Sequence, residues 1–332
     1  MTSTAPLRFD EYQRLCLYHP EHGYYSRGGR AGRRGADFIT SPEVGALFGA
    51  VLANVVDSVW RGLGRPVRFD LVEVGAGRGA LMRSILDAAP QCSEALLAVC
   101  VEQSATLREQ ARELLGDRAE VLAELPARPI AGVILANELL DNLVVRLIER
   151  TPDGWVEVWV GDDGEVLRST DLDPEWSVPV GTRLPVQAEA AAWVASAIGA
   201  LGAGRLIAID YGVATTRELT DRPWLRTYAE HRRGTDPYQS PGDLDITCDV
   251  AFDQLPGSPT ISTQAEFLVR HGIEPLVADA RATWHERAHL GDLPALRARS
   301  RVGEAEALCD PGGLGAFLVA EWNVAAPDRM VE

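Results

Sequence analysis

Strand-like and helix-like patterns of apolar residues alternate along the first half of the chain. The run 69–74 is apolar and short enough to predict a buried strand, and three glycines follow it. Leu81, Ile85 and Leu86 then recur at helical spacing, which predicts a helix that extends to about residue 89. A second strand over 95–101, a helix over 104–115 that ends at Gly116, and a third strand over 132–136 continue the series. This alternation predicts an α/β fold with a mostly parallel sheet, whose ligands bind at the carboxyl ends of the strands.

A long amphipathic helix is expected before the first of these strands. Ser41 is placed as its N-cap, Pro42 as its first helical residue and Glu43 as an acid in its first turn. Apolar residues then recur three and four positions apart from Val44 to Val59, so one helix face is expected to be buried.

The pattern changes to strict alternation over 144–167, which predicts an antiparallel meander inserted into the α/β core. A helix over 186–200 returns to a core strand over 205–212. The stretch 213–260 has little periodicity and many turn residues, so it is expected to form irregular loops that act as a substrate lid. Two helices, over 262–271 and 292–308, and a final strand over 316–322 complete the chain.

These elements predict a discontinuous domain organisation. The expected ranges are an N-terminal helical cap over 1–60, the first part of the core over 61–143, the antiparallel insertion over 144–185, a core helix and strand over 186–212, a substrate-side insertion over 213–300, and C-terminal core strands over 301–332.

Composition narrows the classes of protein that fit. The 332 residues carry 32 basic and 48 acidic side chains, a net charge of -16, and every basic residue other than histidine is arginine. Such a field disfavours nucleic-acid binding. The five cysteines are odd in number and lack a C-x-x-C pair, which argues against a disulfide scaffold or a zinc knuckle. No apolar run is long enough for a membrane span and no secretion signal is apparent, so we expect a soluble cytoplasmic protein.

The glycine loop is the first candidate site. Its order is E-x-G-x-G-x-G, formed by Glu73, Gly75, Gly77 and Gly79, and differs from the G-x-G-x-x-G of dinucleotide-binding proteins. A carboxylate at the strand end repels a pyrophosphate but suits the positively charged amino and sulfonium groups of S-adenosylmethionine (SAM). Glu102 follows the second strand, where either kind of enzyme uses an acid to bind ribose hydroxyls. SAM is therefore favoured, with a nicotinamide enzyme or a purely structural glycine turn as alternatives.

Polar residues also gather after the third strand. Asn137, Glu138 and Asp141 follow it directly, at the edge of the sheet where this fold places its chemistry, although Asn137 and Asp141 could instead only cap a turn. The run 285–289 fits the zinc motif H-E-x-x-H. Because Arg287 lies within it and no third histidine follows at the usual spacing, we expect no metal site.

The ordered motifs together resemble a known family. They are LYHP and GYY at 17–25, DFITSPE at 37–43, EVGAGRG at 73–79, NELLD at 137–141, IDYG at 209–212, LRTY at 225–228, PGDLDIT at 241–247, TQAEFL at 263–268 and DPGGLG at 310–315. The chain is similar in these motifs to the MidA-type family of SAM-dependent methyltransferases, whose mitochondrial members are protein arginine methyltransferases needed for assembly of respiratory complex I. The resemblance implies a class I methyltransferase with a Rossmann-like core.

The positions of polar residues in this fold indicate the site residues. SAM, with S-adenosylhomocysteine as product, is expected to contact residues of the loop and its neighbours: Glu73, Gly75, Ala76, Gly77, Gly79, Glu102, Gln103, Asn137, Asp37, Thr40 and Ser41. The expected catalytic residues are Glu138, Asp141, Asp245 and Asn137. Their carboxylates could pair with a guanidinium and stabilise its charge.

The nature of the acceptor stays open at this point. Many family members have Asp-Ala-Leu-Pro where this chain has Asp141-Asn142-Leu143-Val144. A nitrogen acceptor, with protein arginine first, is expected; a small metabolite, or a non-catalytic assembly factor that binds SAM, are the alternatives. A homodimer is possible, and neither nucleic acid nor membrane is expected as a partner.

Overall fold

The computed structural model describes residues 5–26, 41–229, 232–234 and 236–325. Its chain divides into two compact units. The parallel-sheet unit comprises Phe38–Glu138, Ala197–Asp210 and Ser258–Glu332, and the antiparallel unit comprises Met1–Asp37, Leu139–Ser196 and Tyr211–Gly257. Asp37, Thr40 and the rest of the segment 27–40 lie outside the described residues.

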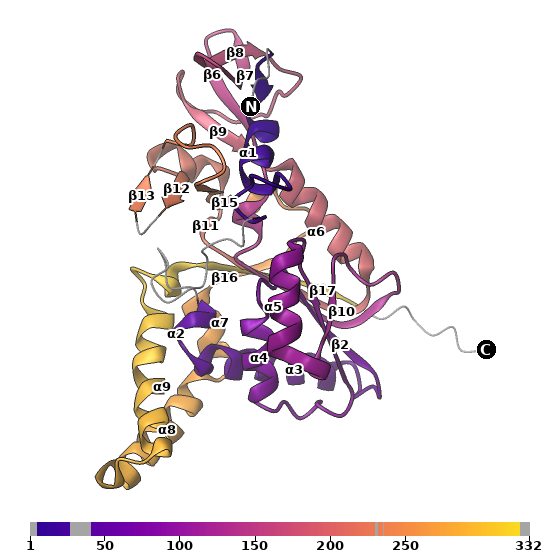
Figure 1. Ribbon diagram of the computed structural model, residues 1–332, viewed down its shortest axis with the longest axis vertical. Coiled ribbons are helices and arrows are strands. Elements are labelled where there is room, and N and C mark those ends of the chain that lie inside the picture. Colours follow the sequence, from indigo (N-terminus) through magenta and orange to yellow (C-terminus); the bar gives the residue numbers. More distant parts are fainter. Residues whose placement is uncertain (1–4, 27–40, 230–231, 235, 326–332) are drawn as a thin grey trace, which may run out of the picture. The chain divides into compact units, whose positions relative to one another are not determined.

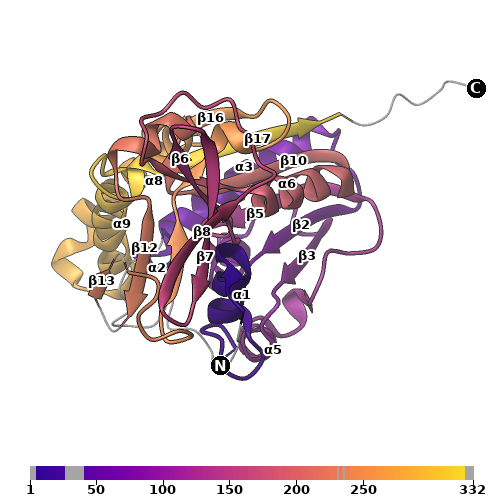
Figure 2. The same ribbon diagram turned by 90° about the horizontal axis from the view of Figure 1, so that it is seen from above.

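The parallel-sheet unit is built on a seven-stranded sheet with the order β16-β17-β10-β5-β2-β3-β4. Strands β4, β3, β2, β5 and β10 are parallel, whereas β17 runs antiparallel to β10 and β16 antiparallel to β17. Several of these strands are visible side by side in Figure 2. Their bounds are β2 Phe69–Val74, β3 Leu96–Val101, β4 Glu120–Leu122, β5 Ile130–Asn137, β10 Leu201–Asp210, β16 Thr260–Thr263 and β17 Leu318–Val324. The predicted mostly parallel, Rossmann-like sheet is confirmed.

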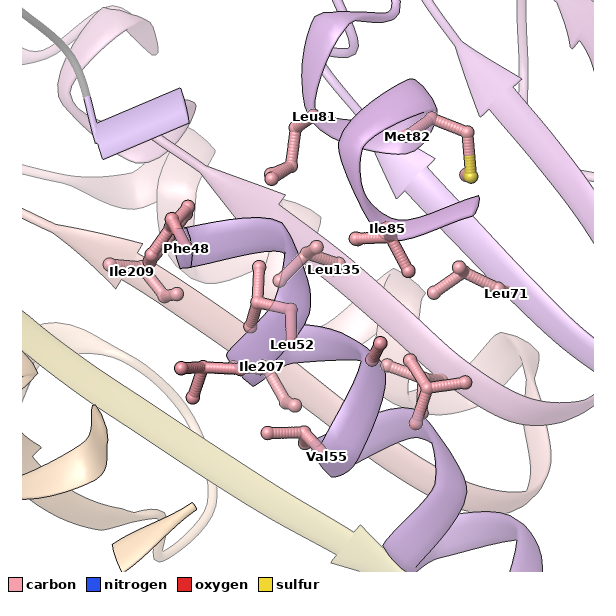
Figure 3. Close-up of a cluster of buried hydrophobic side chains, with 14 of the residues drawn as sticks. Phe48, Leu52, Val55, Leu71, Leu81, Met82, Ile85, Leu135, Ile207 and Ile209 are labelled. Atoms are coloured by element: carbon pink, nitrogen blue, oxygen red, sulfur yellow. The ribbon is translucent and has the colours of Figure 1, made fainter. Parts of the chain in front are cut away.

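Helices of this unit bury apolar faces against the sheet and one another. They are α3 Ala46–Gly62, α4 Ala80–Asp87, α5 Ala105–Leu115, α7 Gln264–Arg270, α8 Ile273–Arg287 and α9 Leu293–Cys309. Figure 3 shows Phe48, Leu52 and Val55 of α3 among Ile207 and Ile209 of β10. Burying each such side chain contributes about 1.5–3 kcal/mol. Helix α3 is thus part of the core, although the sequence placed it in an N-terminal cap.

The helix expected from Ser41 onward is interrupted. A short helix, α2, spans Ser41–Val44, and α3 begins only after Gly45. Gly45 has a φ of 158°, and a Cβ added there would lie 2.2 Å from the carboxyl carbon of Glu304. That carboxylate accepts a hydrogen bond from the backbone N–H of Leu47 at 2.9 Å. Glu304 of α9 therefore caps α3 from another helix, which apolar periodicity could not reveal.

The antiparallel unit contains the predicted meander. Strand order is β1-β7-β6-β9, with β8 paired to β7, and α1, Phe9–Tyr18, contacts β6 and β7. Figure 1 shows β6, β7 and β8 as a group. The bounds are β1 Leu7–Arg8, β6 Arg146–Thr151, β7 Gly154–Gly161, β8 Gly164–Ser169 and β9 Arg183–Val186. Helix α6, Ala188–Ala200, then leads into β10.

The stretch 213–260 is more regular than its sequence indicates. It contains a three-stranded antiparallel sheet of β12 Leu225–Ala229, β13 Arg232–Gly234 and β14 Asp245–Cys248, and β15 Val250–Ala251 pairs with β11 Gly212–Val213. The prediction of irregular loops is wrong here. All four residues of β14 are buried, including Asp245 and Thr247. Because polar residues occupy these core positions, the sequence lacks the alternation of apolar and polar residues that predicts a strand.

Candidate active site

The glycine loop joins β2 to α4, and its glycines have different tasks. Gly75, Gly77 and Gly79 all have positive φ, at 70°, 54° and 79°. A Cβ added to Gly79 would lie 2.8 Å from Cδ1 of Leu115, so this glycine lets α4 pack against α5. A Cβ added to Gly77 would meet no atom within 4 Å. The backbone at Gly77 can therefore be approached closely by a ligand.

Glu102 ties the end of β3 to this loop. Its Oε2 accepts a hydrogen bond from the N–H of Gly77 at 2.9 Å, and its Oε1 accepts one from the N–H of Ser104 at 2.8 Å. Burial raises the pKa of the Glu102 carboxyl. Each carboxylate oxygen has two lone pairs, so ribose hydroxyls could donate to it as well. The adjacent Gln103 is exposed, and its backbone carbonyl accepts a hydrogen bond from Arg108 at 2.7 Å.

Glu73 lies beneath the loop and is only 4% exposed. Its Oε2 accepts a hydrogen bond from the backbone N–H of Met82 at 2.9 Å. Burial raises the pKa of Glu73 to about 8; the hydrogen bond from Met82 opposes this rise, and the charge of Glu102 adds to it. The contact with α4 was not foreseen from the sequence. A cation placed nearby would favour the ionised carboxylate.

Other residues expected at the cofactor have structural partners. Ser41 is fully buried, and its hydroxyl donates to Oε1 of Gln264 at 3.0 Å, which links α2 to α7. The N–H of Ala76 donates to the carbonyl of Val101 at 3.2 Å, and this holds the loop on the sheet.

Asn137 and Glu138 mark the carboxyl end of β5. Glu138 has a φ of 53°, a strained conformation for a non-glycine residue, while its N–H donates to the carbonyl of Ile209 at 2.8 Å. Such strain costs about 1–3 kcal/mol and concentrates at functional positions. Nδ2 of Asn137 donates to Oε1 of Glu138 at 3.1 Å, whereas the buried Oδ1 of Asn137 has no hydrogen-bond partner among the described residues. That unsatisfied acceptor is suited to a polar ligand.

A second group of polar residues, which we call the acid cluster, lies in the antiparallel unit. It consists of Asp141, Asn142, Asp245, Tyr25 and Tyr211. Asp141 is 3% exposed and Asp245 is 8% exposed. The hydroxyl of Tyr25 lies 2.6 Å from Oδ1 of Asn142 and 3.0 Å from Oδ1 of Asp245. Nδ2 of Asn142 donates to Oδ1 of Asp141 at 2.8 Å, and Tyr211 donates to Oδ2 of the same carboxylate. Two predicted catalytic acids are thus brought into one hydrogen-bonded chain.

Arginine charges border this cluster. Burial raises the pKa of Asp141 to about 7, although the Tyr211 hydrogen bond and the charge of Arg226 oppose the rise. The guanidinium carbon of Arg226 lies 4.9 Å from the centre of the Tyr211 ring. Arg226 also pairs with the fully buried Asp249, which a second arginine, Arg222, contacts at 2.9 Å. Sequence reasoning did not assign Tyr25 or these three charged residues to the site.

The zinc-like motif does not form one helical face. His285 lies in α8, whereas His289 lies in the following 3-10 turn Ala288–Leu290. Across the described ranges, no group of three or more histidine, cysteine or acidic side chains could hold a metal ion. None of the helices within those ranges is both long and apolar enough to span a bilayer.

Known relatives identify the class of this fold. Rat "Protein arginine methyltransferase NDUFAF7, mitochondrial" is 30% identical over 295 residues, which cover 76% of this chain and 66% of the relative. The human protein of that name is 31% identical, with coverage of 76% and 65%. The chain therefore spans slightly less than two thirds of the length of these relatives. The predicted relationship to the arginine methyltransferase group is confirmed. The predicted cytoplasmic location is contradicted, because these relatives are named as mitochondrial.

Solved structures agree with the sequence relatives. A Burkholderia thailandensis protein described as a "likely methyl transferase" bound to S-adenosyl-homocysteine superposes with a TM-score of 0.79 at 29% identity, covering 97% of this chain and 89% of the other. A native structure from the same organism gives a TM-score of 0.78 at 26% identity, covering 98% of this chain and 89% of the other.

The family profile that matches residues 51–268 carries the description "Putative S-adenosyl-L-methionine-dependent methyltransferase". This match runs from α3 through the glycine loop and the meander to α7, and it includes every residue of the acid cluster except Tyr25. The chain belongs to this family of SAM-dependent methyltransferases.

Proposed function

We propose that the protein transfers a methyl group from SAM to a guanidinium nitrogen of an arginine in a protein substrate. The observation that carries the choice of acceptor is the acid cluster, in which Asp141 and Asp245 are buried and joined through Asn142 and Tyr25. Buried carboxylates are expensive unless a cation or hydrogen-bond donors satisfy them. A guanidinium supplies both a positive charge and a planar set of donors. The names of the NDUFAF7 relatives support the same acceptor.

The glycine loop and Glu102 have the features that SAM binding requires. Gly77 leaves open space above its backbone, which the methionine part can approach. Glu102 offers acceptor oxygens to the ribose hydroxyls, and Glu73 offers a carboxylate to the cationic end. Asn137, with its unsatisfied buried oxygen, is a further ligand. When bound, SAM supplies an electrophilic methyl group and leaves as S-adenosylhomocysteine.

The chain's own residues have to bind the acceptor, orient it and take its proton. A nitrogen of the guanidinium forms the new N–C bond while the C–S bond breaks, and the methylated product then loses one proton. Asp141, with a pKa of about 7, can accept that proton at neutral pH. Holding nucleophile and methyl at near-attack distance is worth up to about 7–11 kcal/mol, so orientation by the carboxylates is the larger contribution.

Calorimetry and labelled methyl transfer test this proposal. Purified protein should bind SAM and S-adenosylhomocysteine, and should transfer labelled methyl to arginine residues of proteins in a lysate, identified by mass spectrometry. Asp141→Asn and Asp245→Asn should each abolish most of the transfer while SAM affinity stays unchanged. Asp163→Asn, in an exposed turn of the meander, is the matched control and should keep full activity. Transfer only to small metabolites, or SAM binding without any transfer, would reject the arginine acceptor.

A further inference from the structure

Asn142 occupies the middle of the acid cluster. It lies in the 3-10 turn Leu140–Asn142, directly after Asp141. Its Nδ2 donates to Oδ1 of Asp141 at 2.8 Å, and its Oδ1 lies 2.6 Å from the hydroxyl of Tyr25. That hydroxyl lies 3.0 and 3.2 Å from the two carboxylate oxygens of Asp245. The amide thus connects the two acids through one tyrosine.

The orientation of this amide is fixed from several sides. The hydroxyl of Tyr18 donates to the backbone carbonyl of Asn142 at 2.8 Å, and the backbone N–H of Asn142 donates to the carbonyl of Leu139 at 3.3 Å. The rings of Tyr18 and Tyr25 are stacked, with centroids 5.6 Å apart and an interplanar angle of 20°. Two stacked phenols therefore hold the main chain and the side chain of the same asparagine.

The direction of the hydrogen bonds follows from the chemistry of the groups. Burial, together with the charges of Asp245 and Asp141, raises the pKa of Tyr25, so Tyr25 keeps its proton and can donate it. Tyr25 has one hydroxyl proton, so Oδ1 of Asn142 at 2.6 Å and the Asp245 carboxylate at 3.0 and 3.2 Å share it. When the proton is donated to Oδ1 of Asn142, it polarises the amide and strengthens its N–H as a donor to Asp141. The hydroxyl of Tyr211 donates to the opposite oxygen of Asp141. Both oxygens of Asp141 are then held by side-chain donors.

We propose that Asn142 is a positioning residue that orients the Asp141 carboxylate for the acceptor and couples it to Asp245. This role depends on the proposed function only because Asp141 is taken as a group that binds the methyl acceptor. An asparagine side chain donates to a carboxylate through its NH2 group and accepts from a phenol through its carbonyl oxygen, so the two contacts use separate atoms. An aspartate here would remove the donor and place a third carboxylate beside the other two. A leucine would keep the volume and remove both hydrogen bonds.

The test compares Asn142→Asp and Asn142→Leu with the wild-type chain. Asn323→Asp is the matched control, because Asn323 is exposed on β17 and contacts Arg205. Carbonyl-labelled aspartate NMR, with Asp141→Asn used to assign the signal, gives the pKa of Asp141 without any need for activity. Among the described residues, the groups that act on the titration of Asp141 include Tyr211, Arg226, Asp249, Cys248, Tyr25 and Asn142, and Asp245 acts through Tyr25.

Both Asn142 variants should raise the pKa of Asp141 by about one unit or more, because each loses a donor to the charged form. The initial rate of methyl transfer to a pool of arginine-containing peptides should fall by about 10- to 100-fold at pH 7, and the acid limb of its pH profile should move upward with the same pKa. SAM affinity should not change, and Asn323→Asp should match wild type in every measurement.

An unchanged pKa of Asp141 in both variants would overturn the role of Asn142. An inactive wild-type protein that binds SAM would instead reject the proposed function, and the NMR titration would still decide on Asn142. Thermal melts identify a variant that fails to fold, and the second variant then carries the test.

Discussion

The carboxylate of Glu102 accepts a hydrogen bond from the backbone N–H of Gly77 at 2.9 Å. This contact joins the acid after the second core strand to the middle glycine of the loop after the first. The residue that sequence reasoning assigned to the ribose therefore also shapes the loop expected to receive the methionine part of SAM.

Replacing Glu102 should weaken cofactor binding through this double role. A hydrogen bond to a charged group is worth roughly 1.5–3 kcal/mol, so Glu102→Ala should raise the Kd for SAM by at least about 10-fold. Calorimetry at constant pH and salt measures this. Glu120→Ala, at an exposed position on β4, is the control. If both variants bind SAM equally well, Glu102 is not a cofactor ligand.

The glycines Gly77 and Gly79 should respond differently to alanine. Gly79→Ala should destabilise the fold, because the new Cβ meets Leu115 at 2.8 Å. Gly77→Ala should cost only about 1–2 kcal/mol of backbone strain, since its Cβ meets nothing within 4 Å, but it should obstruct SAM. Urea unfolding and SAM titration of both variants separate the two effects. Unimpaired SAM binding by a folded Gly77→Ala protein would show that the cofactor lies elsewhere.

Glu73 makes stability depend on pH. Its pKa in the folded protein is about 8, above its ordinary value of 4.5. Folding therefore favours the protonated carboxyl group of Glu73. The contribution of this protonated group to the free energy of unfolding is fully present below about pH 4.5 and is lost as the pH rises through 8. Glu73→Gln stays neutral, so it should gain stability relative to wild type between pH 5 and 9, by at least about 2 kcal/mol at ~1.4 kcal/mol per pKa unit.

Urea unfolding of both proteins at several pH values measures this difference. A constant difference across the range would contradict a buried, proton-binding Glu73. Added SAM should oppose the effect in the wild-type protein if Glu73 faces its cationic end, because a nearby positive charge favours the ionised carboxylate.

The cap that Glu304 provides for α3 should be measurable as stability alone. Glu304→Ala removes the acceptor for the Leu47 N–H and the partner of Ser300, whose hydroxyl donates to it at 2.8 Å. Loss of a helix cap costs about 0.5–2 kcal/mol, and we expect a lower melting temperature with unchanged SAM affinity. Glu306→Ala, exposed on the same helix, should melt like the wild type.

Local patterns predicted the core of the fold and the cofactor loop well. Strand β2 occupies the expected 69–74, and α5 is capped by Ser104 and ends at Gly116 as expected. Both features depend on residues within a few positions of one another, so periodicity and capping rules detect them. The assignment of individual side chains to SAM remains a prediction.

Only some residues of the acid cluster could be predicted from the sequence, and the reason is physical. Tyr25 and Asp245 are 220 positions apart, and neither an apolar period nor a short motif connects them. The strand that carries Asp245 is buried throughout, so its polar residues resemble those of a loop. Arg226 contacts the Tyr211 ring from β12, which pairs with β14. Its charge further obscures the alternation of apolar and polar residues by which a strand is predicted.

The chain passes from one unit to the other five times, and this has a practical consequence. Each unit is assembled from three separate stretches of chain, with the crossings near residues 37, 138, 196, 210 and 257. Neither unit corresponds to one uninterrupted gene fragment, so a simple truncation cannot yield either of them alone. A chain break at the junction near residue 138, 196 or 210 would divide both units at once, whereas a break near residue 37 or 257 would divide one of them.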